Sequence, residues 1–176
     1  MIKPKHRSKS EHAQTMVEFA IVFPILLLLT YGLIEFGRMI FIYVSVTSAA
    51  REGARYGAGA GFIDPTDPAN TTRYYMYCDG MRTAIRKGAI LTQIPDGAIT
   101  VWYDHGPGTS HFPDAANRCP SGASTYSQDL IKLGDRIGVQ LTVQYTPIIE
   151  FLGFNGFPIH AQSARTVLTD LEFNPP

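Results

Sequence analysis

Residues that could carry out chemistry are few in this chain. Asp104, His105, His111 and Asp114 have atoms that could bind a metal ion, but their spacing matches no ligand motif. We find no nucleophile elbow, no phosphate-binding loop and no two carboxylates placed for acid–base chemistry. The sequence therefore predicts no catalytic residues, no metal site and no cofactor, and it indicates a protein that is not an enzyme.

The two cysteines, Cys78 and Cys119, are far apart in the sequence. In an oxidising compartment they would close a loop of about forty residues, and such a disulfide stabilises a domain by a few kcal/mol. A zinc site needs more donor atoms and usually a closely spaced pair of cysteines. We expect a disulfide, and two buried free thiols are the alternative.

The element that must position the rest of the chain is a long apolar segment near the N-terminus. The 176 residues include 15 basic and 15 acidic side chains, a balance that does not favour nucleic acid as a partner. Residues 19 to 34 contain no charge. As a helix they would extend about 24 Å, slightly less than the ~30 Å hydrocarbon core of a bilayer. This predicts one membrane-spanning helix, with Glu18 or Glu35 reaching the interface or pairing.

Charges on either side of this segment predict its orientation. Four basic residues precede it: Lys3, Lys5, Arg7 and Lys9. Residues 62 to 176, by contrast, contain more acidic than basic side chains. The positive-inside rule then keeps the N-terminus cytoplasmic and exports the C-terminal part across the cytoplasmic membrane. A cleavable secretory signal is the alternative, but apolar sequence continues past Arg38, beyond the roughly 7–15 residues of a signal.

We expect a basic cytoplasmic leader over residues 1 to 13 and a helix over residues 14 to 61. Pro24 should kink this helix, because proline lacks an N–H and clashes with the preceding turn. Four small residues then follow at i, i+3, i+4 and i+7: Ala50, Gly53, Ala54 and Gly57. They form a narrow face that could admit a neighbouring helix, or that could contact the chain's own domain.

Two pairs of opposite charge lie three residues apart on the same helix. Glu35 and Arg38 could pair within the chain, which would lower the cost of placing either near the membrane, or could pair between subunits. Glu52 and Arg55 are expected to form an exposed local pair.

Residues 62 to 176 are predicted to form an exported α+β domain, with one helix packed on an antiparallel sheet. Residues 62 to 72 are expected to form a turn-rich linker. Apolar residues then recur at helical spacing: Tyr74, Cys78, Met81, Ile85 and Ala89. Arg82, Arg86 and Lys87 are expected elsewhere around this helix. Residues 99 to 103, 137 to 145 and 159 to 168 predict three strands. Residues 106 to 126 are expected to form a long surface loop.

Three segments together resemble the TadE-like pseudopilin family, which is related to the type IV pilins. They are Ala-Gln-Thr-Met-Val-Glu-Phe-Ala at residues 13 to 20, Glu-Phe-Gly-Arg at 35 to 38, and Ala-Ala-Arg-Glu-Gly-Ala-Arg-Tyr at 49 to 56. Gly-Asp-Arg at 134 to 136 and Tyr-Thr-Pro at 145 to 147 are similar to the family's C-terminal half. The resemblance implies a minor pilin or biogenesis component of a tight-adherence pilus, with membrane lipid and other pilin-like subunits as partners.

The resemblance also gives meaning to three residues near the start of the helix. Prepilin leaders end at a small residue, usually glycine, where a prepilin peptidase cuts, and a glutamate is fifth in the mature chain. Here Ala13 stands at the cleavage position, and counting from Gln14 makes Glu18 the fifth residue. The new N-terminal ammonium of a neighbouring subunit could neutralise Glu18, or Glu18 could be a solvated boundary charge. Leader cleavage stays open, and so does the choice between a filament and a membrane-resident complex.

Two other classes of protein remain as alternatives. The same helix, left uncleaved, could anchor a stable accessory subunit of another membrane complex. A membrane-anchored extracytoplasmic enzyme or sensor would require a pocket with convergent titratable residues.

Overall fold

The computed structural model consists of one long helix, a short helix and a three-stranded sheet. It describes residues 9–64, 66, 72–90, 92–111, 131–132, 134–149 and 155–167. The elements in order are α1 (Lys9–Gly57), η1 (Tyr74–Met76), α2 (Cys78–Gly88), η2 (Asp96–Ala98), β1 (Ile99–Asp104), β2 (Arg136–Tyr145) and β3 (Phe157–Thr166). The predicted α+β class is confirmed.

The chain separates into two compact units, Met1–Met39 and Ile40–Pro176. In the first unit the described structure is helix α1 alone, and most of its side chains are exposed. The second unit contains the last part of α1, together with α2 and the sheet. Helix α1 runs through the boundary without a break.

The sheet has the order β1-β2-β3, and both strand pairs are antiparallel. Val139 in the central strand lies opposite Val101 on one side and Ser163 on the other. Because side chains alternate along a strand, one face of the sheet is apolar. The buried side chains of this face are Ile99, Val101, Tyr103, Ile137, Val139, Leu141, Val143, Tyr145, Ile159 and Ala161.

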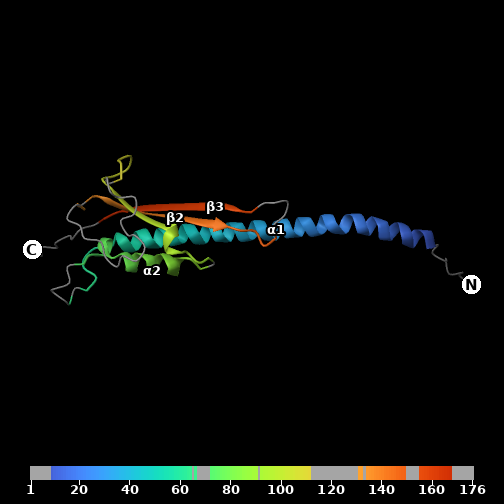
Figure 1. The fold of residues 1–176 in the computed structure, drawn as a ribbon, viewed down its shortest axis with the longest axis horizontal. Coiled ribbons are helices and arrows are strands. Elements are labelled where there is room, and N and C mark those ends of the chain that lie inside the picture. The colour runs from blue at the N-terminus through green and yellow to red at the C-terminus, as the bar shows by residue number, and fades with distance from the viewer. Residues whose placement is uncertain are drawn as a thin grey trace, which may run out of the picture. The chain divides into compact units, whose positions relative to one another are not determined.

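The last part of α1, together with α2, packs on this apolar face (Figure 1). The backbone of Gly53 lies against Ile85 of α2 and Val139 of β2, so a Cβ at Gly53 would overlap the Ile85 side chain. The backbone of Gly57 likewise lies against Met81 of α2 and Ile137 of β2, so a Cβ at Gly57 would overlap these side chains. The small residues therefore allow α1 to approach both elements closely, and α1 is part of the core of the second unit.

The predicted strands are confirmed with small shifts at their ends. Strand β1 includes Asp104, and β3 begins at Phe157 and ends at Thr166 instead of covering residues 159 to 168. The expected helix over residues 74 to 89 is divided, because the 3₁₀ turn η1 precedes α2.

Arg82 differs from the sequence expectation. We expected it outside the apolar stripe, but it is buried, with 4% of its surface exposed. Its guanidinium lies 3.3 Å from Asp79 and 3.6 Å from Asp96. Two nearby carboxylates offset the cost of burying this charge, an effect that apolar spacing alone does not report.

Candidate functional site

Among the described residues, most of the exposed large apolar side chains are on α1. Between Met16 and Val44 these exposed side chains range from 43% exposed at Ile40 to 77% exposed at Met16. By length and composition, the stretch Ala13–Gly57 could cross a membrane, and its most apolar window is not buried within the protein. The Thr30 hydroxyl in this stretch donates to the carbonyl oxygens of Leu26 and Leu27, so it adds no unsatisfied donor. This surface needs lipid or other protein around it.

Glu18 and the two positions of the proposed leader cut are all in α1. Ala13, Gln14 and Glu18 are exposed, and the Gln14 side-chain amide donates to Glu18 Oε1 at 3.3 Å. The carboxylate of Glu18 is thus accessible to a partner molecule from outside the chain. Leader cleavage and a role of Glu18 in assembly stay predictions.

The local charge pairs on α1 are confirmed. Arg38 Nη1 donates to Glu35 Oε1 at 2.7 Å, and the Glu35 side chain is only 13% exposed. Arg55 donates twice to Glu52, with a shortest distance of 2.7 Å, and both side chains are more exposed. Pairing within the chain reduces the charge that Glu35 and Arg38 would bring to a membrane interface. An additional intersubunit role for this pair stays a prediction.

The four-residue small face is inside the second unit. Ala50, Gly53, Ala54 and Gly57 are buried, and the two glycines lie directly against α2 and β2. A second helix could reach this face only by displacing α2 or the sheet. Of the two interpretations left open by the sequence, contact with the chain's own domain is the one that this geometry fits. Pro24 lies within α1, which continues through it, and the kink predicted there stays a prediction.

One partner of the proposed disulfide is buried. Cys78 begins α2 and has no exposed surface. Cys119 lies outside the described residues. The pairing of these two residues stays a prediction.

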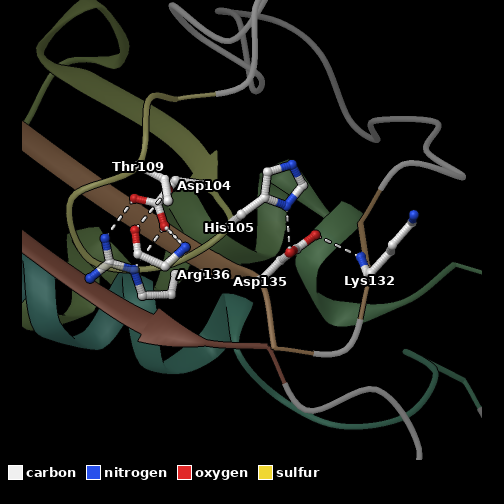
Figure 2. Close-up of polar contacts among 7 residues, drawn as sticks. Asp104, His105, Thr109, Lys132, Asp135 and Arg136 are labelled. Atoms are coloured by element: carbon white, nitrogen blue, oxygen red, sulfur yellow. Dashed lines mark hydrogen bonds and ion pairs between the residues drawn. The ribbon is translucent and has the colours of Figure 1, made fainter.

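A polar cluster closes one end of the β1–β2 pair (Figure 2). The buried Asp104 carboxylate accepts from Arg136 Nε at 2.8 Å and Nη2 at 2.6 Å, and from the backbone N–H of Gly106 at 3.0 Å. Burial alone would raise the pKa of Asp104, but the hydrogen bonds from Arg136 and Gly106 and the Arg136 charge outweigh it and lower this pKa. The hydrogen bond to Asp104 raises the pKa of Arg136 further.

A second buried carboxylate, that of Asp135, lies next to the first pair. Its Oδ1 is 2.8 Å from His105 Nδ1, and its Oδ2 accepts from the backbone N–H of Lys132 at 2.7 Å (Figure 2). The carbonyl oxygen of Asp135 also accepts from the N–H of Val167, just after β3. Asp135 therefore joins the turn before β2, the residue after β1 and the end of β3.

These contacts account for most of the residues that could have bound a metal. Asp104 is engaged by Arg136, and the His111 ring stacks on Trp102 with centroids 4.2 Å apart. Asp114 lies outside the described residues, and among those described no three His, Cys, Asp or Glu side chains form a metal-binding group. The cluster can fasten the ends of three strands together. The sequence analysis missed the Asp104–Arg136 pair, although the charged ends of two neighbouring strands could have suggested it.

A shallow groove lies between α1 and α2. Its volume is about 770 Å³, and its polar lining includes Glu52, Arg55, Tyr77 and Lys87. Glu52 and Arg55 already pair with each other. The groove is thus a surface feature without an evident acid–base arrangement among the residues that line it.

The exposed apolar helix continues into the core of a small α+β domain, and by length and composition this helix could cross a membrane. The family model described as TadE-like protein matches residues 13–55. This match confirms the resemblance over the segment that includes Glu18, the Glu35–Arg38 pair and the small-residue face. No curated protein and no solved structure matches the chain. Together, the family match and the candidate membrane helix fit a pilus-associated membrane subunit.

Proposed function

We propose that this chain is a non-catalytic, single-pass pseudopilin or minor pilin subunit. It assembles through its N-terminal helix into a tight-adherence pilus or the machinery that builds one. The observation that carries this proposal is the TadE-like match over residues 13–55, which includes the exposed apolar part of α1. A helix with this surface is suited to contact lipid first and other helices afterwards.

Glu18 is the residue that we propose sets the register between subunits. A carboxylate close to hydrocarbon is costly unless it is neutralised. The side chain of Gln14 supplies a neutral amide donor 3.3 Å from Glu18 Oε1, which is a weak hydrogen bond. An ammonium group on the N-terminus of a neighbouring subunit would stabilise Glu18 more, and such a group arises if a prepilin peptidase cuts between Ala13 and Gln14.

We further propose an orientation with the N-terminus in the cytoplasm and the second unit outside the cytoplasmic membrane. The four basic residues before position 10 support this orientation through the positive-inside rule. An oxidising compartment would then allow a Cys78–Cys119 disulfide.

The second candidate function is that of a stable accessory subunit in another membrane complex. Ala13, where glycine is usual, favours it, because a Cβ at the cut position could prevent cleavage and leave Glu18 without the ammonium partner. Both candidates use the same anchor, so the state of the N-terminus distinguishes them.

N-terminal sequencing of protein purified from native membranes, with identification of co-purifying chains, tests the proposal. A mature chain that begins at Gln14 and co-purifies with pilin-like subunits supports pilus assembly. An intact leader with an unrelated set of partners would favour the accessory subunit. Recovery from the soluble fraction without detergent would contradict both.

A further inference from the structure

The described residues that flank the turn between β2 and β3 lie at the end of the second unit where α1 enters it. Gly57 abuts Ile137 and Gly53 abuts Val139, so β2 runs antiparallel to α1. From Ile137 to Tyr145 the strand extends about 26 Å, which is the length of about 17 helical residues. Tyr145 therefore lies near the level of Ile40, the first residue of the unit. The residues just after Tyr145 reach the end of the unit.

Large apolar side chains are exposed around this turn. Ile148 is 65% exposed and Ile149 is 55% exposed. Phe157, the first residue of β3, is 36% exposed, and its ring centroid lies 5.4 Å from that of Tyr145. We call Ile148, Ile149 and Phe157 the hairpin tip. Exposed apolar groups gathered at one place often mark a surface that contacts lipid or protein.

Charge is distributed unevenly along the sheet. The polar cluster of Asp104, Asp135 and Arg136 is at the end near Gly57, because Gly57 abuts Ile137, the residue after Arg136. Towards the tip, residues 137 to 149 and 151 to 164 contain no Asp, Glu, Lys or Arg, and Glu150 is the one acidic residue between them. Residues 39 to 50 of α1 contain none. The end of the sheet near Gly57 is therefore more highly charged than the end near the tip.

The part of α1 at the same end presents a similar surface. Phe41 is 64% exposed, Tyr43 is 54% exposed and Val44 is 54% exposed. Aromatic residues with this exposure are typical of the membrane–water interface. From Ile40 the helix continues without a break into the segment that could cross a membrane. Within the second unit, the exposed apolar side chains of α1 and the hairpin tip therefore lie at the same end.

We propose that the hairpin tip inserts into the interfacial layer of the bilayer that α1 would cross and acts as a second membrane contact beside α1. The inference rests on the proposed function, because it requires α1 to span the membrane. Ile148 and Ile149 would lie at the boundary between headgroups and acyl chains, as the apolar face of an interfacial segment does. The charged end of the sheet would then point into the aqueous phase.

Tryptophan fluorescence in the full chain can test this contact. Trp102 is the single tryptophan of the chain and is only 3% exposed. It lies in β1, two residues before Asp104 of the charged end, so its fluorescence supplies a constant background. Ile149→Trp would be reconstituted in vesicles of phosphatidylcholine and phosphatidylglycerol, with or without bromine on the acyl chains. We expect a blue shift and a loss of the added emission in brominated vesicles.

Ile90→Trp is the matched control. Ile90 is 85% exposed, but it follows α2, whose Gly88 packs on Ala49, about 13 Å along α1 from the level of the tip. Its tryptophan should show less quenching than that at position 149. Flotation of the same vesicles separately reports whether the chain is anchored.

Each result decides between the inference and its competitors. Flotation with selective quenching at position 149 supports the lipid contact. Flotation with equal quenching at positions 90 and 149 overturns the inference and leaves the proposed function intact. Flotation without quenching, but with cross-links from position 149 to a second chain, would show that the tip binds protein instead of lipid. Failure to float would remove both the anchoring proposal and the inference.

Discussion

Asp104 and Arg136 face each other in the β1–β2 register and are joined by two hydrogen bonds, of 2.8 Å and 2.6 Å. The Asp104 side chain is 2% exposed and that of Arg136 is 23% exposed. Two-point contacts between a guanidinium and a carboxylate are directional as well as strong. This pair fixes the alignment of the two strands at the end of the sheet opposite the hairpin tip.

A double-mutant cycle should show that the Asp104–Arg136 pair stabilises the domain. We expect Asp104→Asn and Arg136→Gln to be coupled by about 1.5–3 kcal/mol, the range for hydrogen bonds to charged groups. The same cycle on the exposed Glu52–Arg55 pair should give no more than about 0.5 kcal/mol. Thermal and denaturant unfolding in detergent measures both, and equal coupling in the two cycles would refute the assignment.

The pH dependence of stability should carry the signature of Asp104. Its pKa is lowered below the ordinary 3.8 in the folded protein, so the unfolded chain binds the proton more readily. The stability that Asp104 contributes is therefore complete above its unfolded pKa and is lost as the pH falls through the folded pKa. The wild type should exceed Asp104→Asn in stability at pH 7 and lose that advantage below about pH 4. An advantage unchanged at pH 3 would argue against this account.

Adding a methyl group at Gly53 should destabilise the second unit. A Cβ there would overlap Ile85, and overpacking of this kind usually costs about 1–3 kcal/mol. Gly37→Ala is the matched control, because a Cβ at Gly37 meets nothing within 4 Å and alanine favours helix. Circular dichroism melts compare the two. If Gly53→Ala melts like the wild type yet fails to assemble, the small face contacts another subunit after all.

Loss of the Glu18 carboxylate should impair assembly without affecting insertion. Glu18→Gln keeps the size of the side chain but removes the charge that a neighbouring ammonium would meet. We expect normal membrane extraction and reduced co-purification of partner subunits, whereas Glu52→Gln should behave like the wild type in both assays. Unaltered co-purification of Glu18→Gln would remove the proposed register role.

Reduction should lower the melting temperature if Cys78 and Cys119 are bonded. The loop between them holds about forty residues, and a cross-link of that size restricts the unfolded chain by a few kcal/mol. The Cys78→Ala/Cys119→Ala variant should melt at one temperature with or without reductant. A wild type insensitive to reductant would indicate that the bridge is not formed.

Local pattern predicted the architecture well. Residues 137 to 145 alternate cleanly, and the inward set from Ile137 to Tyr145 is buried as expected. The charge-free run over residues 19 to 34 likewise predicted an exposed apolar helix. Both signals depend only on the period of side chains along one element, and this period can be read without knowing what packs on it.

Contacts between elements were harder to predict. The spacing of Gly53 and Gly57 indicated a close approach, but not whether the neighbour would be α2 or another chain. Arg82 interrupts the apolar pattern of α2, and its burial depends on Asp96, which is distant in sequence. Such pairings are set by tertiary structure, and a single sequence contains no direct record of them.

Because buried residues of α1 between Ser45 and Gly57 lie against α2 and the sheet, a water-soluble fragment cannot start after the end of α1. A version trimmed to residue 62 would uncover Ile85, Met81 and Val139 and would be expected to aggregate on expression. Trimming instead to residue 40, with exposed Phe41 and Val44 replaced by polar residues, should retain the buried core of the second unit and remove the exposed apolar part of α1. The boundary at which the chain can be cut therefore lies within the long helix.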